Sequence, residues 1–406
     1  MRGVTGDRWP RVRLGVILAS AMIGVMGVSL LAPVLPTLRG EFGVTDSQVG
    51  LIITVYTLPG IVLTPFVGLA ADRLGRRRTL IPLLFCFGIA GAAIAGATTF
   101  QQVLALRFIQ GVGASALITL AFTLIGDYYT GDQQSAYIGL NSSAIGTGAA
   151  IYPLIGGMLA GIRWNVPFLF FGVSIIVGII AVLVLDEPDF HQPEDLRTYG
   201  ENFKASVQMP AAIGVYLADF AVFFLFYGGI LTAVPLLLTD EFGVTEPWLG
   251  LLLAIVSVTN AIVAAKFGAF EDQASFATLI AAGFCLFGVA LLGINLVTAP
   301  LHVAAVLVVF GVGFGIVMPT LNTVVVTLVS GQLRATMLAV QTSMLRIGQT
   351  AGPVAFTVLA ERYFVSPVVG YRVVLPLFGI ASIILGICGW LVARRIDSSH
   401  DTDGEH

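Results

Sequence analysis

Asp219 is the carboxylate that lies deepest inside an apolar stretch of this sequence. It follows Pro210 by nine residues, which along a helix is a depth of about 14 Å, near the middle of a hydrocarbon core about 30 Å thick. Tyr216, Phe223 and Phe226 follow the same helical stripe. An acid among aromatic rings can hold a lipophilic cation. A carboxylate without a counter-charge in this medium can also take up and release a proton.

Arg346 offers Asp219 a partner at a similar depth. It lies about eleven residues into its own apolar segment, roughly 17 Å, and the two segments run in the same direction. If the two helices are neighbours, the two residues can form a static buried pair that neutralises both charges. A third alternative is that Asp219 only lines a cavity wall. Polar residues flank Arg346: Thr342, Ser343, Gln349 and Thr350. They leave open that Arg346 recognises an anion or a sugar hydroxyl.

The composition is that of an integral membrane protein. Hydrophobic residues make up 57% and charged residues 11% of the 406, and the mean hydropathy is +0.95, whereas about a quarter of a soluble domain is charged. Apolar segments of about 18 to 28 residues can cross a bilayer as helices. Twelve are predicted, at 14–36, 48–70, 80–98, 102–126, 136–160, 166–185, 211–238, 248–269, 275–297, 302–329, 335–360 and 371–392.

The sequence also repeats itself at an offset of 200 residues. The run from Glu41 to Thr45 returns unchanged from Glu241 to Thr245. Further positions recur at the same offset, namely Gly68, Asp72, Gly111, Gly113, Gly148 and Pro153. We therefore predict an all-α membrane fold in which twelve transmembrane helices form two six-helix halves. Internal repeats of this kind are typical of transporters whose halves rock about a central site.

The halves are predicted at 1–185 and 211–392, with a polar cytoplasmic linker at 186–210 and a polar tail at 393–406. The tail is expected to be disordered because it is too polar and too short to pack. Arginine-rich loops stay in the cytoplasm, and an even number of spans places both termini there. The expected location is the plasma membrane.

Several classes of function are excluded by composition and motifs. The net charge of −3 and the clustering of basic residues at membrane ends argue against nucleic-acid binding. Cys86, Cys285 and Cys388 each stand alone in apolar runs, so neither a metal site nor a disulfide is expected. No nucleophile constellation, P-loop or dinucleotide fingerprint occurs. We expect no enzyme activity and no cofactor, and the energy for transport must come from an ion gradient or from the substrate's own gradient.

A loop between the second and third spans carries glycines, an acid and arginines at fixed spacing: Gly68, Asp72, Arg73, Gly75, Arg76 and Arg77. It resembles the G-x-L-A-D-R-x-G-R-[KR]-x signature of the major facilitator superfamily, with Ala70 where leucine is usual. The glycines permit a tight turn. Asp72 and the arginines can pair across helix ends and hold an inner gate shut, and the alternative is a topology signal only.

Arg107 and Gln110 lie three residues apart in the fourth span, hence on one helix face. The run from Arg107 to Ala114 resembles the R-x-x-Q-G-x-G-A motif of the same superfamily, which in antiporters is linked to proton coupling. Arg107 is also only about 8 Å from the end of its span. The competing interpretation is that its side chain snorkels to the interface.

The fifth span carries small residues and one proline: Gly139, Gly148, Pro153, Gly156 and Gly157. This pattern resembles the G-x8-G-x3-G-P-x2-G-G motif associated with antiporters of the superfamily, with Tyr152 where glycine is usual. Small residues let helices approach closely and the proline shapes a bend. The pattern favours export, and close helix packing alone is the alternative.

The resemblance covers about residues 14–392. Together with Asp219 it predicts a monomeric, proton-coupled exporter of small amphipathic or cationic compounds. One alternative is a symporter or facilitator for a sugar or an organic-anion metabolite that Arg346 binds. A non-transporting membrane receptor is a remote alternative, since it would need a folded sensory domain. Asn322, beside Pro319, is the amide expected to contact the substrate.

Overall fold

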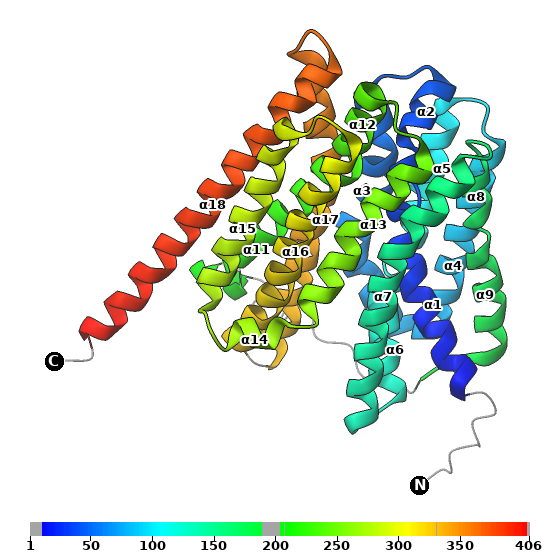
Figure 1. Cartoon of the computed structure of the whole chain (residues 1–406). Helices are drawn as coiled ribbons and strands as arrows, with labels where there is room; N and C mark the ends of the chain where they lie inside the picture. The colour runs from blue at the N-terminus through cyan, green and yellow to red at the C-terminus, as the bar shows by residue number, and fades with distance from the viewer. Residues whose placement is uncertain (1–9, 189–203, 207, 330, 404–406) are drawn as a thin grey trace.

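Helices build both halves of the protein (Figure 1). The computed structural model describes residues 10–188, 204–206, 208–329 and 331–403. The first half contains α1 (Pro10–Ser29), η1 (Ala32–Val34), α2 (Leu35–Phe42), α3 (Asp46–Leu74), α4 (Arg76–Ala93), η2 (Ile94–Gly96), α5 (Phe100–Ala114), α6 (Leu117–Tyr128), α7 (Gly131–Ala160), α8 (Val166–Phe170) and α9 (Val173–Val184). The second half contains α11 (Pro210–Phe224), η3 (Leu225–Ala233), α12 (Val234–Phe242), α13 (Glu246–Ala264), α14 (Phe267–Glu271), α15 (Phe276–Gly293), η4 (Ile294–Leu296), α16 (Pro300–Leu328), α17 (Gly331–Arg362) and α18 (Pro367–Asp403).

Eleven helical segments among the described residues are long and apolar enough to cross a membrane, where twelve were predicted. The twelfth, predicted at 335–360, is the 32-residue helix α17, which carries more polar residues than the others. Its neighbours α3, α11, η3 and α18 pack around it. A polar helix is accommodated here because protein covers much of its surface.

Both ends of the described chain lie on one side of the bundle, which we call the terminal side (Figure 1). The opposite side, where α2 and α12 lie, is the far side. Of the predicted linker at 186–210, residues 189–203 and 207 lie outside the described part.

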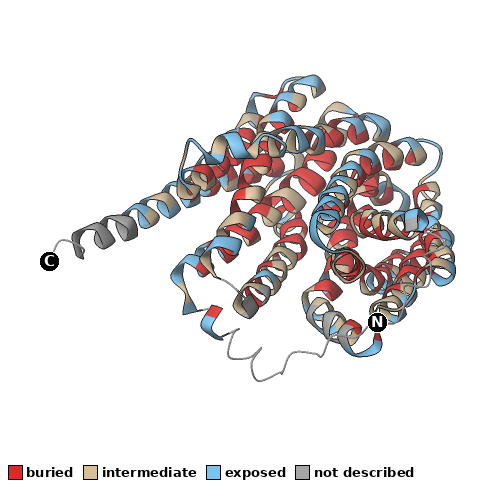
Figure 2. Cartoon of the chain, turned by 90° about the horizontal axis from the view of Figure 1, so that it is seen from below, coloured by how far each residue is buried: buried red, intermediate tan, exposed pale blue. Residues whose placement is uncertain are grey.

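The last helix, α18, continues to Asp403, and disorder of the tail stays a prediction. Figure 2 shows the exposed part of α18 that precedes the tail projecting away from the bundle. A long helix extends without a new nucleation step. Arg394 adds a contact one turn back, with its guanidinium carbon 4.0 Å from the centre of the Trp390 ring.

The repeated run of five residues forms the same local structure twice. Gly43 ends α2 with φ +60°, and Gly243 ends α12 with φ +62°. This left-handed conformation favours glycine because it has no Cβ. Thr45 and Thr245 follow as the residues that precede α3 and α13. The sequence repeat is therefore a repeat of helix ends.

Packing inside the two halves follows the same offset. A Cβ at Gly111 would lie 2.1 Å from the carbonyl oxygen of Tyr56, and a Cβ at Gly311 would lie 2.9 Å from that of Val256. Each pair stands 200 residues from its counterpart. Glycine is needed at these positions because the backbones of two helices touch, which is how helices associate in a membrane.

The two halves meet through contacts at two equivalent positions. A Cβ at Gly250 of α13 would lie 2.2 Å from the carbonyl oxygen of Pro153 in α7. A Cβ at the equivalent glycine of α3, Gly50, would lie 3.1 Å from the Thr357 hydroxyl and 3.5 Å from the carbonyl oxygen of Pro353 in α17. We call these two contacts the glycine–proline contacts. They place α7 against α13 and α3 against α17.

Charged and polar groups seal the far side beyond these contacts. Arg39 donates from Nη1 to Asp240 of the other half at 2.7 Å and to Asp46 at 2.6 Å. The Tyr371 hydroxyl donates to Asp46 at 2.9 Å, and Glu361 accepts from the Ser47 backbone at 2.8 Å. Three of these four bonds cross between the halves, so the far side is closed.

The halves separate toward the terminal side. One stripe of α7 faces α13 and contains, in order from the far side, Gly157, Pro153, Ala149, Gly146 and Gly139. The first three touch α13, and the Ala149 carbonyl accepts from Ser257 at 3.1 Å. A Cβ at Gly146 or Gly139 would find no atom within 4 Å. The structure is therefore closed on the far side and open along α7 on the terminal side.

The first testable consequence concerns packing within the first half. A Cβ at Gly156 would lie 1.8 Å from the Leu30 carbonyl oxygen, so Gly156→Ala forces α7 away from α1. We expect a loss of about 1 to 3 kcal/mol of stability, measured as a lower melting temperature in detergent. Gly139→Ala is the matched control because its Cβ meets open space. Equal melting temperatures for the two variants would contradict this packing.

A second consequence concerns the closure between the halves. Gly250→Ala places a Cβ against Pro153 only while the far side is closed, so the variant should favour the conformation that opens there. Thr357, fully buried beside Gly50, is changed to Cys as a reporter in a background without the native cysteines.

Maleimide labelling of this cysteine should be faster with Gly250→Ala than without it. Gly40→Ala is the control, since its Cβ meets no atom within 4 Å. A labelling rate that Gly250→Ala leaves unchanged would show that the glycine–proline contact does not hold the far side closed.

Candidate functional site

Arg107 is locked in place by the backbone of neighbouring helices. It is 0% exposed, and its Nε donates to the Ile52 carbonyl at 3.1 Å and its Nη2 to that of Gly27 at 2.9 Å. Nη1 donates to Gln110 at 2.6 Å, and the guanidinium carbon lies 4.1 Å from the centre of the Tyr56 ring. The snorkelling interpretation is wrong, because these carbonyls and the ring satisfy the guanidinium inside the half.

Asp219 is buried on the second half. The residue is 0% exposed, and neither carboxyl oxygen has a hydrogen-bond partner that meets strict geometry among the described residues. Gln341 of α17 is the polar side chain beside it. Gln341 in turn donates to Asn322 of α16 at 3.3 Å. Asp219 thus stands at the buried end of a short polar row that we call the amide row.

Asn322 is the exposed end of the amide row. An amide at this depth is unfavourable against lipid, so its exposed face points to the water-accessible space on the terminal side. The row joins Asp219 to that space through Gln341, which is 5% exposed.

The aromatic residues of the Asp219 stripe are occupied by neighbours. Phe226 packs against Phe314 of α16 with ring centres 5.0 Å apart and the rings tilted by 51°, and Phe223 meets the same ring at 5.9 Å. The Tyr216 hydroxyl lies 2.7 Å from the Ser206 hydroxyl. These rings belong to the core of the second half, so in this conformation they do not form an open cage around a cation.

Asp219 and Arg346 do not pair, although their depths agree. The Arg346 guanidinium instead donates from Nη1 to Gln349 at 3.3 Å. The reason is rotation about α17. Gln341, beside Asp219, and Arg346 are five residues apart, which is about 140° around a helix. Arg346 therefore faces α3 and the other half, where Gly60 lies against its side chain.

Polar groups from both halves surround Arg346. Thr350, one turn along α17, donates its hydroxyl to Thr57 of α3 at 3.0 Å. Tyr56 and Tyr227 lie within electrostatic reach of the guanidinium, and Tyr227 lies beside Gln349. Gln349 and Thr350 are predicted neighbours of Arg346 from the sequence, whereas Tyr227 is recognised only in the structure.

Tyr227 is brought to this place by a π-helical segment, η3. The Thr232 hydroxyl donates to the Tyr227 carbonyl at 2.8 Å, five residues back, which stabilises the wider turn. Gly228 follows and lies against the backbone of Gly352 in α17. Such segments are frequent at functional sites. The sequence signal is the consecutive pair Gly228 and Gly229, which is unusual inside a helix.

The arginine loop on the terminal side folds onto its own half. Arg76 donates to Asp127 of α6 at 3.0 Å, and the Arg77 guanidinium donates to the Val182 carbonyl at 2.8 Å. Glu187 accepts from the backbone of Arg77 at 3.1 Å, at the positive end of α4. These three contacts of the loop stay within this half.

The surroundings of Gly68 and Asp72, two predicted residues of that loop, lie outside what the structure describes. Arg73 is exposed. Gly75 adopts φ +110° between α3 and α4, as the expected tight turn requires. The role of the loop as an inner gate stays a prediction.

The small residues of α7 are used in three different ways. Gly156 touches α1 and Gly157 touches α13, whereas Gly139 meets open space. A Cβ at Gly148 would lie 2.9 Å from the Tyr152 ring. The ring of this unusual tyrosine therefore packs in the space that the glycine at position 148 leaves.

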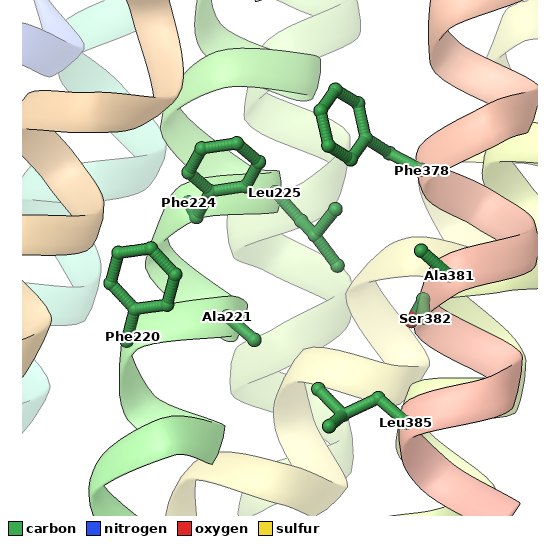
Figure 3. Close-up of a pocket in the computed structure, with 8 residues that line it drawn as sticks. All are labelled: Phe220, Ala221, Phe224, Leu225, Phe378, Ala381, Ser382 and Leu385. Carbon is green, nitrogen blue, oxygen red and sulfur yellow. The ribbon is translucent and has the colours of Figure 1, made fainter. Parts of the chain in front are cut away.

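Figure 3 shows a small pocket on the second half, between α11 and α18. Phe220, Phe224 and Phe378 line it together with leucine and alanine side chains. Its one polar side chain, Ser382, donates to the Phe284 carbonyl at 2.7 Å. The pocket belongs to one half alone and offers no charge, so it differs from the Arg346 region, to which both halves contribute.

Known proteins resemble this chain along most of its length. The Bacillibactin exporter of Bacillus subtilis (strain 168) is 28% identical over 355 residues, which are 83% of this chain and 87% of the relative. The quinolone resistance protein NorA of Staphylococcus aureus is 30% identical over 175 residues, 43% of this chain and 44% of the relative. The NorA match thus spans less than half of either protein.

Solved structures share the fold at low sequence identity. A bacterial homologue of the human lysosomal transporter Spinster, in an inward-facing and occupied conformation, has a TM-score of 0.80 at 17% identity, covering 97% of this chain and 98% of that one. The nucleoside transporter NupG has a TM-score of 0.74 at 13% identity, covering 92% and 98%.

The family model described as Major Facilitator Superfamily matches residues 17–353 and 220–406. These matches span both six-helix halves and the signature loops that the sequence analysis identified. The chain therefore belongs to the major facilitator superfamily and is a membrane transporter, not an enzyme.

Proposed function

We propose that this protein exports small amphipathic compounds from the cytoplasm in exchange for protons, by alternating access. The observation that carries the proposal is Asp219, which is buried and bound to no cation. An unpaired buried charge raises the free energy of the protein. Binding a proton neutralises the carboxylate and removes that cost. The amide row gives that proton a route between Asp219 and the terminal side.

Export is supported by the relatives, one named as an exporter and another as a resistance protein. The small-residue pattern of α7 points the same way. The arginine-rich loops lie on the terminal side, which assigns that side to the cytoplasm of a cell with this protein in its plasma membrane. The structure then has the substrate-loading conformation of an exporter.

The proposed transport cycle alternates between closure of the far side and closure of the terminal side. In the present conformation the glycine–proline contacts and Arg39 close the far side. Substrate enters from the cytoplasm to the region where both halves contribute side chains, and the halves then rock to open the far side. Asp219 takes up a proton while the far side is open. It releases that proton through the amide row when the cytoplasmic side opens again.

One chain supplies both halves of this pathway, so we propose that the monomer transports. The cationic substrate class is less well supported than the amphipathic one. The Asp219 carboxyl and the rings of Phe223 and Phe226 are engaged within the second half, so they do not offer a lipophilic cation an open face.

The test is Asp219→Asn in inside-out vesicles, with uptake of amphipathic fluorescent dyes driven by an imposed proton gradient. An amide mimics the protonated acid but releases no proton. We therefore expect gradient-driven uptake to fall to the level of empty vesicles, while dye exchange without a gradient continues. Asp132→Asn makes the same change at an exposed position and serves as the control.

Two outcomes would contradict the proposal. If Asp219→Asn retains gradient-driven uptake, Asp219 is not the proton site. If the unmodified protein carries dye at the same rate with and without the gradient, proton coupling itself is wrong.

A further inference from the structure

Arg346 contacts the other half at a point farther from the far side than Thr357 and Thr350 do. Going from the far side along α3 and α17, the cross-half contacts are Gly50 with Thr357, Thr57 with Thr350, and then Gly60 with Arg346. Arg346 is partly exposed, whereas Gln349 and Thr350 above it are buried. Its guanidinium therefore lies at the inner, closed end of the space that opens to the terminal side. We call this inner end the roof.

The positive charge of Arg346 is not neutralised by the described residues. Among the described residues, Arg13, Arg39, Arg76 and Arg372 each form a salt bridge, and Arg346 forms none. Its Nε is buried without a hydrogen-bond partner, and Nη1 meets the neutral amide of Gln349. An unpaired guanidinium inside a membrane is costly and usually functional. Its planar fork matches the two oxygens of a carboxylate.

A second positive charge strengthens the same field. Tyr56 lies under the electrostatic influence of both Arg107 and Arg346. Among the described residues, Arg107 donates to two carbonyls and an amide and lies over a ring. Asp219 lies beside Gln341, on another side of α17. The potential at the roof is therefore positive.

The first half presents a bare helix surface at the position equivalent to Arg346. The repeat places Gly146 of α7 there, and a Cβ at Gly146 would find no atom within 4 Å. Ser142, Ser143 and Thr147 beside it are exposed. The apolar body of a bound molecule can lie against this surface, while Arg346 itself faces α3.

We infer that Arg346 binds the carboxylate, or another oxyanion, of the exported compound, so that the substrates are amphipathic organic anions or zwitterions. The inference rests on the proposed export function and names its substrate class. Gln349 accepts from the guanidinium and Tyr227 lies beside Gln349, so an amide and a hydroxyl are near the same anion. Tyr56 belongs to the same electrostatic environment. A lipophilic cation would meet an unscreened positive charge at this roof.

The experiment measures binding to the purified full-length protein in detergent, without any gradient. The probes are rhodamine B, which has a free carboxylate, and its ethyl ester, which has the same ring system and is a cation. We expect rhodamine B to bind at least about tenfold more tightly than the ester, because a charged hydrogen-bonded pair is lost in the ester.

Arg346→Gln should remove that preference by weakening rhodamine B and not the ester, and Arg346→Lys should keep part of it. Arg362→Gln makes the same change at an exposed site on the far end of α17 and should leave both affinities unchanged. Melting temperatures of the variants show which of them fold. Equal binding of the two dyes to the unmodified protein overturns the inference without the need for any variant.

Failure of the inference can be told apart from failure of the proposed function. A carboxylate preference that depends on Arg346, together with uptake that ignores the proton gradient, keeps the anion site and removes proton coupling. Gradient-driven uptake that is equal for both dyes, and that Arg346→Gln leaves unchanged, keeps the exporter and removes the anion site.

Discussion

The close approach of two helix pairs through glycine is the constraint on which this structure depends. Lipid offers helices no hydrophobic drive to associate, so contact must come from packing and polar bonds. At Gly50 and Gly250 the missing side chains let the halves touch at the backbone of Pro353 and Pro153. Because that contact covers only the far part of each helix, the same helices diverge below it and open the transport space.

The sequence repeat explains how the helices pack. The positions where the repeat is broken by a charged residue indicate the functional sites. Both halves must close against each other in the same way, so the packing glycines and prolines recur at the offset of 200 residues. A proton or an anion needs its binding group only once. Asp219 accordingly has Ala19 as its counterpart, and Arg346 has Gly146. Positions where two otherwise equivalent halves differ in charge are therefore the candidates for function.

Much of the fold could be predicted from the sequence, because the length of apolar runs, the repeat and the helix-ending glycines act locally. The site could be predicted only in part. Depth along a helix gave the right level for Asp219 and Arg346, but whether two side chains meet depends on rotation about the helix, which depth does not contain. Snorkelling of Arg107 failed for a related reason, since the carbonyls that bind it belong to other helices.

The rotation between Gln341 and Arg346 around α17 keeps proton binding at Asp219 separate from anion binding at Arg346. A direct arginine–aspartate pair would have placed both functions at one site. A static pair would neutralise the proton site and the anion site together, and neither could then change its charge during transport. With Gln341 on one side of α17 and Arg346 on another, both sites remain separate yet belong to one helix. A shift of α17 against α3 must therefore move the environment of Asp219 and of the substrate at once. That shared helix is a physical link through which proton binding and substrate release can be coupled, without direct contact between the two charges.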